Sequence, residues 1–296
     1  MDQIIQSSKQ EMVVVTRSKV MVKDGCVVYI NCEGNVFNVP QCNTIFVLLA
    51  EGTSITNDAV RLLSENNVTL LWVSAGATQP YAITSPTSNY RPTKYMQSLC
   101  SFWFDEVKRL CAAKWLMQAR VDYVEVVSET LKGAIDVDDR KIQKLFNTTR
   151  QAIVKCNSVQ ELLGVEGNFV KKLYQAYANE YAISFTRDTK DSKGVNGLLT
   201  KGNYYAYGTA ASSIYTLGLD NSFPFIHGKT RKGGLVFDVA DIVKTAVILP
   251  LAFKAYDQNL SSREYKQLCV ETFAKYKVHR YNVDTLKNLL SEFSCL

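Results

Sequence analysis

The sequence lacks the features that would direct it to a membrane or to secretion. No uninterrupted apolar run approaches the roughly 20 residues that a membrane helix needs, and no basic stretch followed by a hydrophobic one stands at the start. None of the eight cysteines forms a C-x-x-C pair, and several lie inside apolar runs such as LCSFWF, so we expect reduced thiols in the core. We therefore expect a soluble, cytoplasmic protein without a membrane partner.

Histidine is scarce, and the two that are present differ in setting. His279 lies in the basic, aromatic segment KYKVHRY, which a solvated helix end explains, so we do not expect it to bind a metal. His227 begins the basic, glycine-rich tract HGKTRKGG. The G-K-T in this tract does not indicate a nucleotide-phosphate loop, because Phe223 occupies the position where that loop needs a glycine.

The positive charge is unevenly distributed. The chain has 296 residues, 47% of them hydrophobic, and a net charge of +6, which suits one large domain or two ordinary ones. Basic and acidic residues balance as far as Tyr95, so the whole excess lies in the remainder of the chain. This favours a polyanionic partner for that part, although a solvated basic face is an alternative.

The pattern of residues indicates an α+β fold with two domains. Short runs rich in Val, Ile, Phe and Tyr fill residues 12–83, with turn signals at KDG and EGN and one helix capped by Thr56 or Asn57. The segment TSPTSNYRPTKY places a boundary near Tyr90. We predict a small β-sandwich-like domain over 1–90 and a larger, all-α domain over 91–296. Because the second domain carries the excess positive charge, we expect it to be the working part that meets a polyanion.

Helical periodicity then predicts seven helical segments. They cover residues 93–131 with one break, 138–156, 159–185, 203–219, 235–254, 261–276 and 283–293.

The third of these segments carries a carboxylate in its apolar stripe. Ser158 and Glu161 have the spacing of a capping box, which fixes the start of the helix. From that start, Glu166 occupies a position where the stripe calls for an apolar residue, with Gly164 and Gly167 close by. A glutamate at the edge of the stripe is the simpler interpretation, but glycines also permit close approach of a ligand.

The fifth segment carries three charges on a single face. Asp238, Asp241 and Lys244 follow one another at three-residue spacing in an otherwise apolar helix. Unpaired carboxylates in such a position are costly, so a cation must accompany them, either a basic side chain or a metal ion.

Together these segments offer an oxygen-rich set of metal ligands. Glu166, His227, Asp238 and Asp241 supply three carboxylates and one imidazole, which suits Mg²⁺ or Mn²⁺ and phosphodiester chemistry. An ordinary loop histidine beside a buried ion-pair network is an equal alternative. The basic residues that could neutralise a nucleic-acid backbone are Lys229, Arg231, Lys232 and Lys244.

A basic, aromatic segment beginning at Lys201 is a weaker candidate for nucleic-acid contact. Its three tyrosines, Tyr204, Tyr205 and Tyr207, could stack on bases, but we favour packing inside the protein for at least two of them.

The motifs resemble those of the CRISPR-associated adaptation integrases, which insert new spacers into a CRISPR array. GVEGNFVKKLY looks like the family's glutamate helix, NYYAYG like its Asn-x-x-x-x-Gly helix start, and IHGKTRKGGLVFDVADIVK like its histidine loop and Asp-x-x-Asp helix. NYRPTKYMQ and FWFDEVKRL are most similar to type I-F members.

The resemblance implies roles for these residues. Glu166, His227 and Asp241 would hold the divalent metal, Asp238 would be a further acidic residue needed for activity, and Lys244 would contact a phosphate. The reaction would be attack by the 3′-hydroxyl of a short double-stranded DNA fragment on a phosphodiester of the repeat array.

The resemblance also implies partners. The chain would form a homodimer through its β-domain and would assemble with the small adaptation protein, which is fused to the helicase-nuclease in type I-F. Two other functions remain open: a structure-specific, metal-dependent DNA nuclease, and a DNA-binding assembly subunit whose carboxylates are only structural.

Overall fold

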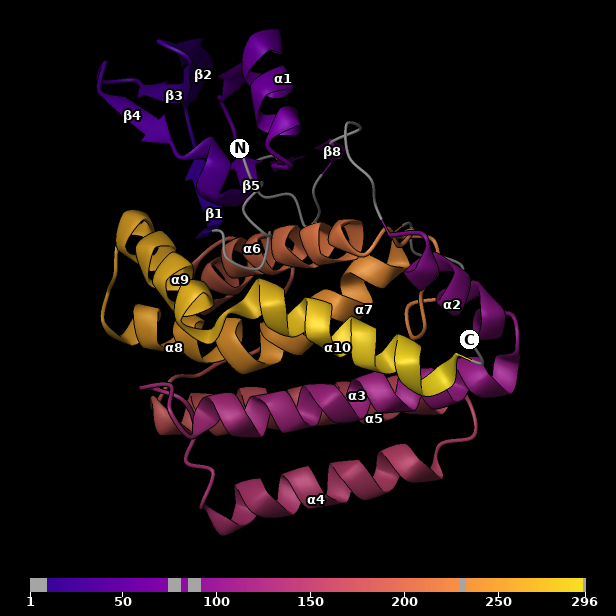
Figure 1. Cartoon of the computed structure of the whole chain (residues 1–296). Coiled ribbons are helices and arrows are strands. Elements are labelled where there is room, and N and C mark those ends of the chain that lie inside the picture. The colour runs from indigo at the N-terminus through magenta and orange to yellow at the C-terminus, as the bar shows by residue number, and fades with distance from the viewer. Residues whose placement is uncertain (1–9, 74–80, 85–91, 229–232, 295–296) are drawn as a thin grey trace.

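The computed structural model describes residues 10–73, 81–84, 92–228 and 233–294, with strands in the first part of the chain and helices in the rest (Figure 1). This confirms the predicted α+β class. The strands are β1 (Gln10–Val15), β2 (Ser18–Lys23), β3 (Cys26–Asn31), β4 (Val36–Val39), β5 (Thr44–Leu49), β6 (Ser54–Ile55), β7 (Thr69–Trp72) and β8 (Ala82–Thr84), with the helix α1 (Asn57–Glu65) before β7.

The strands form two four-stranded sheets. The first has the order β1-β5-β7-β8 and is parallel except for β8, and the second has the order β4-β3-β2-β6. The predicted KDG turn joins β2 to β3, with Asp24 and Gly25 both at positive φ as a tight hairpin requires. Thr56 caps α1 by accepting a hydrogen bond from the backbone N–H of Ala59, as predicted.

Strand β5 of the first sheet is buried on both faces because it lies between two cores. On β5, Phe46 and Leu48 join the core of the helical part, whereas Val47 and Leu49 pack with the second sheet and α1. This alternation follows from the period of two in a strand. Strands give way to helices close to the predicted boundary between 1–90 and 91–296, but the hydrophobic core continues across that boundary.

The helical part contains nine α-helices among the described residues. They are α2 (Lys94–Trp103), α3 (Glu106–Ser128), α4 (Arg140–Lys155), α5 (Val159–Glu180), α6 (Gly194–Thr216), α7 (Gly234–Val243), α8 (Leu249–Asp257), α9 (Ser262–Tyr276) and α10 (Val278–Phe293).

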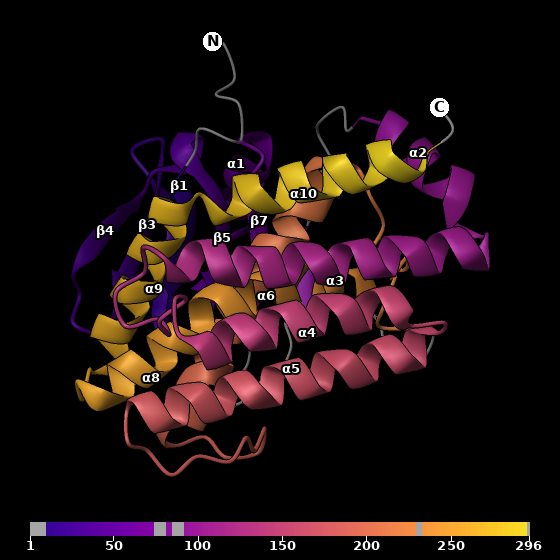
Figure 2. The same cartoon turned by 90° about the horizontal axis from the view of Figure 1, so that it is seen from below.

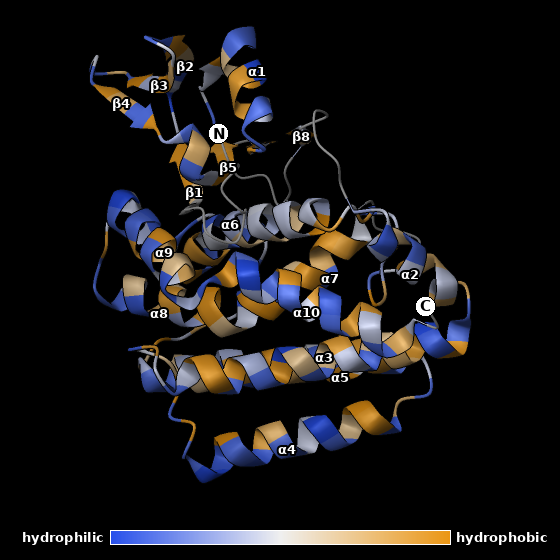
Figure 3. Cartoon of the chain, viewed as in Figure 1, coloured by the Kyte–Doolittle hydropathy of each residue, from blue (hydrophilic) through white to orange (hydrophobic). Residues whose placement is uncertain are grey.

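Helix α6 is the centre of this arrangement. It lies beneath the strands in Figure 1 and contacts β5 above it and α7, α8, α9 and α10 around it. Seen from below, α3, α4 and α5 run side by side on the face of the helical part that is turned away from the strands and toward the viewer (Figure 2). The hydropathy colouring shows α7 mostly in the hydrophobic shade, and all ten of its residues are buried (Figure 3).

Several predicted helix limits differ from the structure. The helix expected at 203 begins at Gly194, and the helix expected at 283 begins at Val278. The segment 235–254 is helical, but a π-helical turn, Lys244–Ile248, separates α7 from α8. Periodicity of 3.6 residues does not reveal these ends, since tertiary contacts rather than the apolar stripe determine them.

Two smaller predictions need correction. Ser158 caps α5 as predicted, but Glu161 bonds to the backbone of Asn157 rather than to Ser158. His279 is 1% exposed and therefore is not at a solvated helix end. Burial lowers its pKa to about 4.

The cysteines are free thiols, but most of them are not in the core. Among the described residues, Cys156 and Cys269 are buried, and the remaining five are exposed at positions 26, 32, 42, 100 and 111. No helix in the described part of the chain is long and apolar enough to cross a bilayer.

The contact between α6 and the first sheet depends on a glycine. A Cβ at Gly208 would lie 2.7 Å from Cε2 of Phe46, which is fully buried. We expect Gly208→Ala to lower the free energy of unfolding by about 1–3 kcal/mol because Phe46 cannot move without disturbing the core. Denaturant unfolding followed by circular dichroism measures this.

The matched control is Gly164→Ala on α5, where a Cβ would meet no atom within 4 Å. This substitution should leave stability unchanged or raise it by up to about 1 kcal/mol, since alanine favours helix. Equal stability of the two variants would contradict the role given to Gly208.

Candidate metal and DNA site

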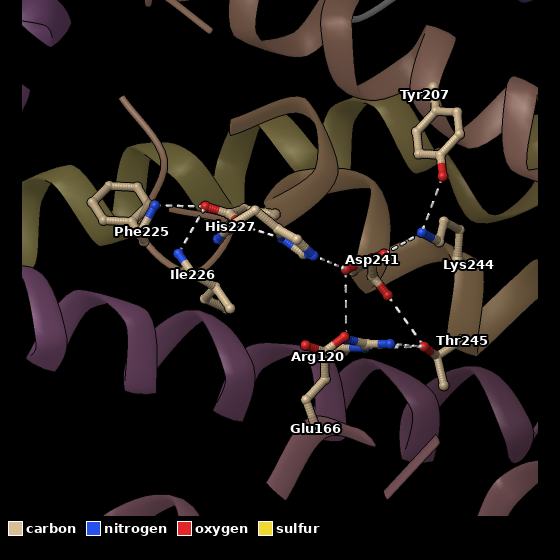
Figure 4. A network of polar contacts seen from close by, with 10 residues as sticks. Arg120, Glu166, Tyr207, Phe225, Ile226, His227, Asp241, Lys244 and Thr245 are labelled. Atoms are coloured by element: carbon tan, nitrogen blue, oxygen red, sulfur yellow. Dashed lines mark hydrogen bonds and ion pairs between the residues drawn. The ribbon is translucent and has the colours of Figure 1, made fainter. Parts of the chain in front are cut away.

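Asp238 connects α7 to the loop that carries His227. Its carboxylate is completely buried and accepts hydrogen bonds from the backbone N–H groups of Phe225 at 2.6 Å, Ile226 at 3.1 Å and His227 at 3.0 Å. Oδ1 of the same carboxylate lies 2.7 Å from Nδ1 of the His227 ring. Figure 4 shows the other ring nitrogen of His227 directed toward Asp241. The hydrogen-bond acceptor capacity of this carboxylate is used entirely within the protein, so Asp238 orients the imidazole rather than facing a ligand.

His227 therefore presents its second nitrogen to the site. Nε2 lies 3.6 Å from Oδ2 of Asp241, one helical turn further along α7 than Asp238. Holding Nδ1 by a carboxylate is the usual way in which proteins orient a metal-binding histidine. The two aspartates therefore contact different sides of the ring: Asp238 holds Nδ1, and Asp241, three residues later, faces Nε2.

Glu166 approaches the same place from α5, as its position in the apolar stripe predicted. The neighbouring stripe residues Leu162, Phe169 and Leu173 are fully buried, while the Glu166 side chain is 15% exposed. No atom lies within 4 Å of a Cβ at Gly164 or Gly167, so these glycines do not serve a close contact within the chain.

Glu166, His227 and Asp241 converge. Each offers a ligand atom, and these atoms lie within 4.8 Å of one another. Within the described ranges, this trio is the one group of His, Cys, Asp or Glu found at such spacing. Two carboxylates and one imidazole are a donor set that suits Mg²⁺ or Mn²⁺, so the residues fit the ion that the sequence implied.

Two cations accompany the carboxylates: Arg120 is buried, and the Lys244 side chain is 21% exposed. Arg120 of α3 donates from Nη1 to Oε1 of Glu166 at 2.7 Å and lies 3.9 Å from Oδ2 of Asp241. Lys244, at the start of the π-helical turn, pairs with Oδ1 of Asp241 and donates to the hydroxyl of Tyr207 at 3.4 Å. The buried ion-pair network considered from sequence is therefore present together with the convergent ligand set.

These contacts change the acidities in consistent directions. Burial acts to raise the pKa of Asp241, but Lys244 and Arg120 oppose it and hold that pKa below its usual value. Burial likewise acts to lower the pKa of Lys244, but the charge of Asp241 opposes it, and the pKa of Lys244 is raised overall. For His227, burial lowers the pKa, whereas the hydrogen bond to Asp238 and the nearby carboxylates raise it above 6.5 overall.

The trio opens into a cavity of about 800 Å³. Arg120, Glu166, His227, Asp241 and Lys244 line one part of it. The rest of the lining includes further hydrogen-bond donors and cations, namely Lys171, Tyr174, Gln175, Thr186, Arg187, Thr189, Asn203 and Tyr207. The mixture of two acidic residues and four cations suits a phosphate group beside a divalent ion.

The other predicted DNA contacts lie elsewhere or outside the described residues. Lys201 donates to the hydroxyl of Ser262 at 2.8 Å and does not line the cavity. Lys229, Arg231 and Lys232 fall outside the described part of the chain. The tyrosines at 204, 205 and 207 are all buried, as the packing interpretation favoured, and Tyr207 also borders the cavity.

Sequence reasoning missed three cations of the site. Arg120 interrupts the apolar stripe of α3 between Leu116 and Val124, which is the same signal that identified Glu166. Lys171 and Arg187 gave no such signal, because only the fold brings the middle of α5 and the loop that follows α5 beside the site.

Comparison with known proteins identifies relatives along nearly the whole chain. Residues 12–270 match the family model described as CRISPR associated protein Cas1. The CRISPR-associated endonuclease Cas1 of Pectobacterium atrosepticum is 33% identical over 98% of this chain and 95% of its own length. That of Pseudomonas aeruginosa is also 33% identical, over 97% of this chain and 94% of its own.

Two solved structures share the fold. A TtCas1–DNA complex has a TM-score of 0.69 at 21% identity and covers 95% of this chain and 91% of its own. A casposase bound to an integration product has a TM-score of 0.74 at 14% identity, with the same two coverages of 95% and 91%.

The coupling of His227 to Asp238 predicts a pH dependence. In metal-free protein we expect His227 to titrate above 6.5 and His279 near 4, which NMR of the two imidazoles resolves. The folded-state pKa of His227 lies above its unfolded value. The contribution of the protonated His227 to the free energy of unfolding is therefore complete below the unfolded pKa and is lost as pH rises through the folded pKa.

Asp238→Asn should lower the pKa of His227, since the carboxylate charge is removed from the ring nitrogen it contacts. The His279 resonance serves as the internal control and should not move. An unchanged His227 pKa in this variant would show that Asp238 does not control the ring.

Proposed function

The chain belongs to the Cas1 family of CRISPR-associated proteins, and we propose that it is a divalent-metal-dependent DNA endonuclease and integrase that inserts short fragments into a CRISPR array. The observation that carries this proposal is the convergence of Glu166, His227 and Asp241 on a cavity lined by cations. The reaction would be a transesterification in which a 3′-hydroxyl attacks a phosphodiester, and hydrolysis would be the same attack by water.

Glu166, His227 and Asp241 would hold the ion, either Mg²⁺ or Mn²⁺. When bound, such an ion activates a hydroxyl and stabilises negative charge on the phosphate. Asp238 serves the same site as a positioning residue, because it holds the imidazole so that Nε2 faces Asp241.

The cavity wall supports DNA as the ligand. Lys244 lies beside Asp241, where it could contact the phosphate under attack, as the sequence suggested. Lys171 and Arg187 extend the positive charge away from the trio. Arg187 is held in place, since its Nη1 donates to Asn196 at 2.9 Å and to the backbone oxygen of Asp188 at 2.9 Å. A strand in the cavity would therefore contact cations as well as the trio.

We also propose that the chain acts as a homodimer through residues 1–90, together with the small adaptation partner that is fused to the helicase-nuclease in type I-F. Exposed apolar side chains on the edge strands β4 and β8 support the first part: Val36, Phe37 and Ile83 are 51%, 42% and 38% exposed. Exposed apolar groups at a sheet edge favour pairing with another chain.

Removing one trio carboxylate tests the proposal. Asp241→Asn should reduce Mg²⁺- or Mn²⁺-dependent joining of a short duplex to a repeat-containing plasmid by at least about 100-fold, because the neutral amide is a poor metal ligand. The assay contains the chain, its adaptation partner and both DNAs, and joined product is measured on gels. Asp284→Asn is the matched control, since Asp284 forms only a surface pair with Arg280.

The outcomes separate the competing functions. Joining that survives Asp241→Asn would overturn the site assignment. Cutting of branched DNA without joining would favour a structure-specific nuclease. DNA binding that neither metal nor Glu166→Gln affects, with no reaction, would favour a non-catalytic assembly subunit.

The salt dependence of DNA binding tests whether the DNA backbone lies in the cavity. Lys171→Ala should weaken binding of a short duplex with 3′ single-stranded ends. It should also reduce the slope of the logarithm of the binding constant against the logarithm of salt concentration by about one, since one phosphate contact is lost. Lys201→Ala, outside the cavity, is the matched control for charge and should change the slope less. A larger effect at Lys201 would place the DNA on another face. Fluorescence anisotropy at several salt concentrations measures both.

A further inference from the structure

Arg120 is held rigidly at the metal site by contacts on two sides. Its side chain is 6% exposed. Nη1 donates to Glu166, while Nε and Nη2 both donate to the hydroxyl of Thr245, at 2.9 and 2.7 Å. Thr245 in turn donates to the backbone oxygen of Asp241 at 3.2 Å. The guanidinium cannot turn away from the carboxylates without breaking several buried hydrogen bonds.

The charges of the two cavity carboxylates are already compensated in the metal-free chain. Glu166 pairs with Arg120, and Asp241 pairs with Lys244 and lies near Arg120. The third carboxylate, Asp238, is satisfied by backbone N–H groups and the imidazole. A divalent ion that joined the trio would add two positive charges beside a guanidinium that stays protonated. In a buried site this repulsion is weakly screened.

A phosphodiester in the cavity would reverse this balance. Its negative charge would offset the excess that the ion brings, and Lys171 and Arg187 are placed to hold it. We propose that Arg120 keeps the affinity of the trio for a divalent ion low until a DNA phosphate enters the cavity, so that metal and DNA bind cooperatively. This rests on the proposed function, because it takes the trio as the metal site and DNA as the ligand.

Cooperativity of this kind has a reciprocal form that can be measured. If DNA raises the affinity for the ion, the ion raises the affinity for DNA by the same factor. The role differs from that of a structural arginine, which would support Glu166 and whose loss would weaken metal binding with and without DNA.

The experiment measures Mn²⁺ binding to the full chain by electron paramagnetic resonance, with and without a short duplex. The duplex has 3′ single-stranded ends that terminate in dideoxynucleotides, so that no joining takes place. For the wild-type chain we expect the duplex to raise Mn²⁺ affinity at least about fivefold. Anisotropy should give the same factor for the effect of Mn²⁺ on DNA binding.

Three variants assign the effect to the charge of Arg120. Arg120→Gln should raise DNA-free Mn²⁺ affinity by about fivefold and should reduce the gain that DNA produces. Arg120→Lys keeps the charge and should stay within about twofold of the wild type. Arg150→Gln is the matched control, because Arg150 also pairs with two carboxylates of α3, Asp122 and Glu125, but does not line the cavity.

The outcomes distinguish this inference from the proposed function. A wild-type chain that binds no Mn²⁺ even with DNA would overturn the metal site itself. Equal Mn²⁺ affinity with and without DNA in the wild type would overturn the inference about Arg120 but not the proposed function. This measurement uses the wild-type chain only, so it does not depend on the folding of a variant. Weaker or unchanged DNA-free binding in Arg120→Gln, with circular dichroism like that of the wild type, would also overturn it.

Discussion

The cost of burying carboxylates governs the architecture around α7. Asp238 and Asp241 lie in a helix whose ten residues are all buried, and neither could remain ionised there without compensation. The two aspartates are compensated differently. Asp238 receives N–H donors from the loop at 225–227, whereas Asp241 receives cations. The loop and the helix are thereby joined, and His227 is oriented by the carboxylate that holds its own backbone.

The fold brings the partners of these carboxylates from distant parts of the chain. Arg120 comes from α3, Glu166 from α5 and Lys244 from the π-helical turn after α7, and α3 packs against both α7 and that turn. The turn itself is notable because π-helical geometry, which is uncommon, recurs at functional sites. The buried α6, which contacts β5 as well as α7, connects the sheets to the site.

The candidate site could be predicted where a charge interrupts an apolar pattern. Glu166 and Asp241 were identified in this way, and the structure places both beside His227. Arg120 carries the same signal in α3, but an arginine does not offer a metal ligand. Lys171 and Arg187 could not be found, because cations on polar segments of helices and loops have no distinguishing local pattern. For the same reason the exposure of five cysteines was missed, since an apolar neighbourhood in sequence does not determine which face a side chain occupies.

The α+β class, a helix cap at Thr56 or Asn57, the cap at Ser158 and the residues that offer metal ligands could all be predicted without the fold. The reason is that periodicity, capping and ligand chemistry are properties of short segments. Tertiary structure decided what surrounds those ligands. Whether Asp238 faces an ion or a backbone loop, and whether Glu166 meets a cation, depend on the packing of helices that are remote in the chain. The balance of charge at the site is therefore a property of the fold, since it is set by distances between side chains that local sequence does not fix.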